Sequence, residues 1–136
     1  MLTVTKRFKF EAAHNLPNYK GNCHNLHGHS YNLEVTVTGP VDNDSASPTF
    51  GMIIDFNELS RIVKQYIVNK YDHQFLNDYF NNPTAENMCV DFGKQISEHL
   101  PAHVILKSVK LWETDSSYAE YIPEYYSMGD CLMPAT

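Results

Sequence analysis

The residues of this chain best suited to chemistry lie between Cys23 and His29, a segment of seven residues with three histidines and one thiol. Side chains two positions apart on an extended backbone point to the same face, so His27 and His29 can bind one metal ion together. Gly28 stands between them and lets the backbone come close to a ligand. Two histidines do not complete the coordination shell of zinc, so a third ligand must come from elsewhere in the chain.

His14 is the predicted third ligand, because a hairpin would bring it opposite His27 and His29. Alternating apolar and polar residues predict strands over about residues 2–14 and 31–38, and the loop between them places the end of the first beside the start of the second. In both strands the histidines continue the apolar face. Three neutral imidazoles without a fourth protein ligand leave one position for water or substrate, as in catalytic zinc sites.

Three further residues could take part in the chemistry, and each leaves alternatives open. Cys23 lies four residues before His27, where a cation would favour its thiolate as a nucleophile or base; otherwise it is a fourth zinc ligand or an inert loop thiol. Asp72 and His73 lie between two predicted helices and could relay a proton to or from that thiol. Otherwise they are a turn-capping aspartate and a surface histidine.

Glu113 is a carboxylate on an apolar strand face, following Val109 and Leu111 on the side that the helices are expected to cover. Such a group needs a partner. The partner is either a buried cation or the N–H donors of a ligand, such as the guanidine-like edge of a heterocycle. The other histidines have no comparable argument and are expected at the surface: His24, His99 and His103.

The composition predicts one soluble domain, because 136 residues can bury a core without disulfides. A formal charge of -6 and the absence of a lysine or arginine cluster argue against nucleic acid or an anionic membrane as partner. Three cysteines without a C-x-x-C pair fit a reducing cytoplasm. Residues 1–9 alternate between apolar and polar types, unlike the apolar core of a signal peptide, and no apolar run in the sequence approaches transmembrane length.

Two helices must position these residues. The first is predicted from Asp55, as N-cap with Glu58 as its capping-box partner, to about residue 69. The second has Thr84 as its cap and follows a non-helical segment. Two strands and an irregular tail complete the chain, at about 104–113, 118–122 and from 123 on.

The order strand, strand, helix, helix, strand, strand predicts an α+β fold, an antiparallel four-stranded sheet with both helices on one face. The opposite face is polar along the first two strands, so it must meet water. It is either an ordinary solvated surface or the lining of a wet channel in an oligomer.

Taken together, the motifs resemble those of the 6-pyruvoyl-tetrahydropterin synthase family over about residues 1–122. The resemblance implies the tunnelling fold, in which ββααββ subunits trimerise into a barrel, two trimers usually stack into a hexamer, and the pocket is assembled at subunit interfaces. The motifs occur in the family's order: F-x-A-A-H (10–14), C-x-x-x-H-G-H (23–29), Asp55-Phe56, Asp72-His73, P-T-A-E-N (83–87) and Trp112-Glu113-Thr114.

The resemblance also implies a role for each candidate residue. Zinc would be held by the three histidines and would acidify the hydroxyls of a dihydropterin substrate. The thiol would accept a proton with the help of the aspartate and histidine pair, and Glu113 would anchor the aminopyrimidine edge of the pterin. The sets are His14, His27 and His29 for the metal, Cys23, Asp72 and His73 for catalysis, and Glu113, Thr84 and Glu86 for the substrate.

The spacing C-x3-H-G-H looks like that of the 6-carboxy-tetrahydropterin synthases of queuosine and deazapurine biosynthesis, whereas the pyruvoyl synthases resemble C-x5-H-G-H. The expected enzyme is a zinc-dependent lyase that converts 7,8-dihydroneopterin triphosphate to 6-carboxy-5,6,7,8-tetrahydropterin, acetaldehyde and triphosphate, with Lys20 and Lys6 or Lys9 meeting the triphosphate. The alternatives are a pyruvoyl product, a zinc-stabilised protein without activity in which Cys23 closes the site, and a zinc hydrolase with Asp72 or Glu113 as base.

Overall fold

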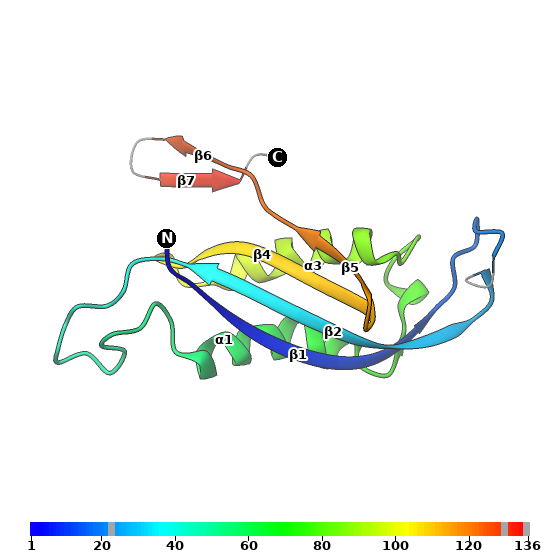
Figure 1. The fold of residues 1–136 in the computed structure, drawn as a ribbon, viewed down its shortest axis with the longest axis horizontal. Coiled ribbons are helices and arrows are strands. Elements are labelled where there is room, and N and C mark those ends of the chain that lie inside the picture. Colours follow the sequence, from blue (N-terminus) through cyan, green and yellow to red (C-terminus); the bar gives the residue numbers. More distant parts are fainter. Residues whose placement is uncertain (22–23, 129–130, 135–136) are drawn as a thin grey trace.

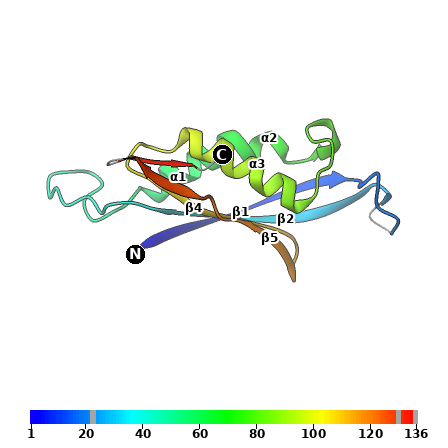
Figure 2. The ribbon, with the colours of Figure 1, turned by 90° about the horizontal axis from the view of Figure 1, so that it is seen from above.

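The computed structural model describes residues 1–21, 24–128 and 131–134. A twisted five-stranded sheet carries the helices on one face and leaves the other face bare (Figure 1, Figure 2). The α+β content confirms the predicted fold class. In sheet order the strands are β3 (Gln74–Phe75), β1 (Thr3–His14), β2 (His27–Thr38), β4 (Ile105–Thr114) and β5 (Ser117–Tyr121).

Strand β3 makes the sheet mixed, so the prediction of an antiparallel four-stranded sheet is wrong in this detail. It pairs in parallel with β1, Ala12 opposite Gln74 and Ala13 opposite Phe75, and a short 3-10 turn, η3 (Leu76–Asp78), follows it. Two residues are too few to show an alternating pattern. The strand exists because the edge of β1 offers unpaired backbone groups at this point.

The β1–β2 hairpin is the longest pairing in the sheet and follows the predicted alternation. Its register runs from Thr3 opposite Thr38 to His14 opposite His27. The inward side chains form the core, among them Phe8, Phe10, Tyr31, Leu33, Val35 and Val37.

The outward face of the hairpin is polar, as the sequence predicts. Glu34 accepts hydrogen bonds from Arg7 Nε at 2.9 Å and from Trp112 Nε1 at 2.7 Å, and the hydroxyls of Thr5 and Thr36 are 2.7 Å apart. Three neighbouring strands are therefore joined by polar side chains on the face that no helix covers (Figure 2).

The first helical segment begins where the sequence predicts, with the Asp55 carboxylate accepting a hydrogen bond from the Asn57 N–H at 2.8 Å. The predicted capping box is not formed, because Glu58 binds Arg61 one turn further on, at 2.7 Å and 3.0 Å. The Arg61 guanidinium gives Glu58 two charge-assisted hydrogen bonds, which are stronger than the single bond that a backbone N–H would donate in a capping box. The segment comprises α1 (Phe56–Val63), a π-helical turn η2 (Lys64–Val68) and α2 (Asn69–Tyr71).

The second helix, α3 (Ala85–His99), has the predicted cap, since Thr84 Oγ1 accepts a hydrogen bond from the Asn87 N–H at 3.1 Å. Its buried face includes Met88, Cys89 and Phe92 and packs on β4 and β5. The start of α3 lies beside the end of β1, because the Pro83 carbonyl oxygen is 2.8 Å from His14 Nδ1, and the candidate site lies there.

The C-terminal segment forms an antiparallel pair, β6 (Tyr125–Met128) and β7 (Cys131–Pro134), where the sequence predicts an irregular tail. Figure 1 shows the pair set apart from the main sheet. Strands of four residues carry too little alternation for a prediction. Among the described helices, none has the length and apolar character needed to cross a bilayer.

Candidate metal centre

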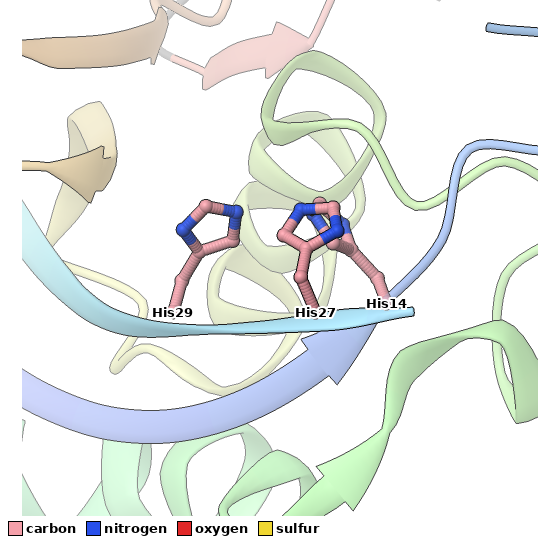
Figure 3. Close-up of side chains that lie close together, drawn as sticks. All are labelled: His14, His27 and His29. Carbon is pink, nitrogen blue, oxygen red and sulfur yellow. The ribbon is translucent and has the colours of Figure 1, made fainter. Parts of the chain in front are cut away.

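Three histidine rings meet at the open end of the β1–β2 hairpin, on the side that the helices cover. Figure 3 shows the rings of His14, His27 and His29 on the same side of the two strands. One ligand atom from each ring lies within 4.8 Å of the others, and His14 is 1% exposed. The rings converge as the hairpin predicts, and the cluster could hold a metal ion.

Backbone carbonyls orient two of the rings. His14 Nδ1 lies 2.8 Å from the carbonyl oxygen of Pro83, and His27 Nδ1 lies 2.7 Å from that of Asn25. A carbonyl only accepts, so each Nδ1 carries the proton and each Nε2 presents a lone pair. These two Nε2 atoms are 3.0 Å apart. Two facing lone pairs repel unless a cation or a proton lies between them, so the pair is suited to share an ion.

His29 completes the donor set. Among the described residues its Nε2 is buried without a hydrogen-bond partner, which is rare for a polar atom in a folded protein. Burial lowers the pKa of His29, although Glu113 opposes the shift. The ring therefore stays neutral, the form that binds metal. Three neutral imidazoles are a donor set that fits zinc with one position left for another ligand.

Glu113 follows the buried Val109 and Leu111 at alternate positions of β4, and this alternation assigns it to the side of the sheet that carries the rings. Its charge acts on both His29 and Tyr31, and burial, assisted by Glu113, raises the pKa of Tyr31 well above its usual range. Tyr31 consequently remains a protonated phenol. The half-buried Glu113 is thus close enough to the candidate centre for its charge to act there. The sequence leaves two partners open for it, a cation or the N–H donors of a ligand.

Asp72 and His73 lie along the outer edge of β1. The Glu11 N–H donates to Asp72 Oδ1 at 2.8 Å, and the Glu11 carbonyl accepts from the His73 N–H at 2.5 Å. His73 Nδ1 lies 3.0 Å from Asp72 Oδ2. Adjacent side chains do not usually meet in this way, and His73 also has a backbone conformation uncommon outside glycine, with a φ of +60°.

This pair is ionisable and accessible. The Glu11 N–H, with His73, holds the pKa of Asp72 below its ordinary value. The His73 side chain is 77% exposed and borders a groove of about 460 Å³ that Gly28, Ser30 and Phe75 also line. A left-handed, non-glycine residue next to a carboxylate is the kind of backbone strain that clusters at functional sites.

The other predicted residues are distributed unevenly around the centre. Cys23 lies outside the described residues. Thr84 follows Pro83, the residue whose carbonyl holds His14, while Glu86 is exposed on the first turn of α3. Of the lysines, Lys9 and Lys20 are exposed and Lys6 is half-buried. Sequence reasoning missed the carbonyls of Pro83 and Asn25, because a main-chain contact leaves no mark in the side-chain pattern.

Comparison with known proteins relates this chain to pterin-converting enzymes. The family model described as 6-pyruvoyl tetrahydropterin synthase matches residues 3–124. The chain is 37% identical to a 6-carboxy-5,6,7,8-tetrahydropterin synthase of Synechocystis, covering 89% of this chain and 93% of the relative. It is 36% identical to a dihydroneopterin monophosphate aldolase of Pyrococcus furiosus, covering 81% and 88%.

A solved structure of Caenorhabditis elegans 6-pyruvoyl tetrahydropterin synthase has the same fold, with a TM-score of 0.76 at 25% identity over 90% of this chain and 96% of the other. The chain belongs to the 6-pyruvoyl tetrahydropterin synthase family. Its relatives support a pterin-synthase function, that of a lyase-type enzyme.

Proposed function

We propose that this protein is a zinc-dependent 6-carboxy-5,6,7,8-tetrahydropterin synthase that acts on 7,8-dihydroneopterin triphosphate and releases acetaldehyde and triphosphate. The observation that carries the proposal is the cluster of three imidazoles, with two opposed Nε2 atoms 3.0 Å apart and a third that is buried without a partner among the described residues. When bound there, zinc would supply a Lewis acid for the substrate's side-chain hydroxyls.

The remaining roles are those that the family resemblance implies. His14, His27 and His29 hold the ion through Nε2. Glu113 accepts the N–H donors of the aminopyrimidine, assisted by Thr84 and Glu86 at the start of α3. A carboxylate suits that edge because it can accept two parallel hydrogen bonds. Cys23 accepts the proton removed from the substrate.

Asp72 and His73 assist that proton transfer, the aspartate staying ionised and holding the imidazole at 3.0 Å. The pair needs cover from another subunit, since the His73 side chain is 77% exposed and water would otherwise compete for the proton. This exposure supports a homo-oligomer. The family resemblance implies its form, trimers closed into a barrel and stacked into a hexamer, with the polar face of the sheet lining the lumen. Within this proposal the whole chain is one domain, it works in the cytoplasm, and its pathway is that of queuosine or related deazapurines.

Two alternative reactions on a pterin are each addressed by one observation: formation of a pyruvoyl product and turnover of the monophosphate. The interval of three residues between Cys23 and His27 favours the carboxy product over the pyruvoyl product. The similarity to a dihydroneopterin monophosphate aldolase favours a third reaction, on the monophosphate.

The experiment offers 7,8-dihydroneopterin triphosphate and, separately, the monophosphate to zinc-loaded protein and identifies products by mass. A 6-carboxy product with acetaldehyde is expected from the triphosphate. A pyruvoyl product, or turnover of the monophosphate alone, would replace the proposal by the corresponding alternative. No turnover of either pterin by assembled, metal-loaded protein would overturn it.

The competing hypothesis is a protein without enzymatic activity, in which four protein ligands, Cys23 among them, close the zinc site. Cys23→Ala separates the two. In the enzyme the variant keeps zinc and loses turnover, whereas in a closed site it loses zinc. Zinc content by mass spectrometry, measured beside activity, decides between these outcomes.

A further inference from the structure

Asn77 makes a two-point contact with the backbone that leaves the candidate metal centre. The Asn15 N–H donates to Asn77 Oδ1 at 3.0 Å, and Asn77 Nδ2 donates to the Asn15 carbonyl at 3.0 Å. Asn15 directly follows His14, the last residue of β1. Both main-chain groups of the first residue beyond the strand are therefore satisfied by a single side chain.

This contact continues the β1–β3 pairing after β3 has ended. The parallel ladder pairs Ala12 with Gln74 and Ala13 with Phe75, and Asn15 and Asn77 keep the same separation of 62 residues. At Leu76 the chain turns into η3, so no backbone strand is left for Asn15 to pair with. An amide side chain presents the same donor and acceptor as a peptide group and replaces it here.

Two contacts restrain His14, one at its ring and one at the backbone that follows it. His14 is held on its ring by the Pro83 carbonyl at 2.8 Å and on its following peptide by Asn77. Leu76, which is 0% exposed, anchors the turn that carries Asn77 in the core. The β1–β2 pairing ends at His14 opposite His27, so the amide contact from Asn77 is what holds the Asn15 peptide just beyond that pairing.

We propose that Asn77 is a positioning residue for the metal centre, holding the His14 backbone so that its Nε2 stays in place to bind the ion. The inference rests on the metal site of the proposed function. Asn77 does not touch the ion and acts through His14. Partners of metal ligands that lie outside the coordination shell typically contribute 10–100-fold to affinity, and we expect Asn77 to fall in that range.

The test measures zinc affinity by competition with a chromophoric chelator and records the visible spectrum of the cobalt-substituted protein. Asn77→Ala removes both hydrogen bonds, and Asn77→Asp keeps the acceptor but loses the donor to the Asn15 carbonyl. We expect both variants to bind zinc at least about tenfold more weakly and to show an altered cobalt spectrum. Asn69→Ala, at an exposed asparagine of α2, is the matched control, and its zinc affinity and cobalt spectrum should equal those of the parent protein.

If Asn77 only stabilises the fold, its variants should lower the melting temperature of the metal-free protein and leave zinc affinity and the cobalt spectrum unchanged. That result would overturn the inference. Asn77→Asp, which is isosteric, carries the test if Asn77→Ala does not fold. A parent protein that binds no zinc would overturn the metal site and the proposed function together. A parent that binds zinc but does not turn over a pterin would overturn only the proposed reaction.

Discussion

His14 Nδ1 and the carbonyl oxygen of Pro83 are 2.8 Å apart, although 69 residues separate them in the chain. The contact joins the last residue of β1 to the residue before the N-cap of α3. Because the carbonyl accepts the Nδ1 proton, it fixes both the orientation of the ring and the tautomer that leaves Nε2 free. The start of α3 is therefore part of the candidate metal centre.

Removal of the α3 cap tests this relationship. Thr84→Ala loses the hydrogen bond to the Asn87 N–H, and we expect the protein to lose about 1 kcal/mol of unfolding free energy. Because the same turn carries the Pro83 carbonyl, zinc affinity should fall as well. Asp55→Ala removes the equivalent cap of α1, at the other end of the sheet (Figure 1), and serves as control. It should cost similar stability and leave zinc affinity unchanged; equal zinc affinity in both variants would refute the link.

Loss of a ligand should affect metal binding more strongly than loss of any supporting contact. We expect His29→Ala to weaken zinc binding by more than about 100-fold, beyond the range for outer-shell partners. His99→Ala, at an exposed ring on α3, is the control. Zinc content after dialysis against a chelator measures both. Retention of one zinc per chain by His29→Ala would remove His29 from the ligand set.

Glu113→Gln should separate substrate binding from metal binding. The neutral amide cannot accept two N–H donors as a carboxylate does, and a hydrogen bond to a charged group contributes about 1.5–3 kcal/mol. We expect kcat/KM for the pterin to fall about 10- to 100-fold while zinc content is retained. Glu120→Gln on β5, at an exposed position, should behave as the parent protein. An unchanged kcat/KM would show that Glu113 does not contact the substrate.

Gly93 is needed because α3 approaches β5 closely. A Cβ at this position would lie 2.6 Å from Tyr121 Cε2, which is inside van der Waals contact. Alanine is the better helix former, but overpacking of this kind costs about 1–3 kcal/mol, so we expect Gly93→Ala to destabilise the fold. Urea denaturation measures the effect, with Lys94→Ala on the exposed face of the same helix as control. The double variant Gly93→Ala/Tyr121→Ala should lose less stability than the sum of the single changes.

Stability at acid pH should depend on Glu34. Burial opposes ionisation of this group, but hydrogen bonds from Trp112 and Arg7 hold the pKa of Glu34 below its ordinary value of 4.5. A carboxylate with a lowered pKa in the folded state stabilises the protein above the unfolded-state value, and this contribution is lost as the pH falls through the folded-state value.

The stabilisation from Glu34 should therefore be complete above about pH 4.5 and be lost as the pH falls from there through the lower folded-state pKa. We expect Glu34→Gln to lower the unfolding free energy by about 1 kcal/mol at neutral pH and to converge on the parent protein in acid. Denaturation curves measured from pH 7 to pH 3 check this, with Glu98→Gln as control for the loss of one charge. A difference that stayed constant with pH would contradict the assignment.

The sequence by itself determined the local elements and the face on which each side chain lies. Alternation along β1 and β2 fixes which residues point inward, and it carries His14, His27 and His29 to one side. The caps at Asp55 and Thr84 are equally local, since a side chain there binds an N–H two or three residues away. Periodicity and capping act over a few residues, so they can be detected from sequence alone.

Only the tertiary structure decided which main-chain groups complete the site. The carbonyl that orients His14, the strand β3 that makes the sheet mixed and the clamp from Asn77 to Asn15 all join residues more than sixty positions apart. The contact between Asp72 and His73 is local in sequence, but His73 also has a φ of +60° and donates its N–H to the Glu11 carbonyl, 62 residues away, which the local pattern does not predict. The His14, Asn15 and β3 contacts each use the backbone on at least one side, and the backbone is the same at every position, so the order of side chains does not encode them.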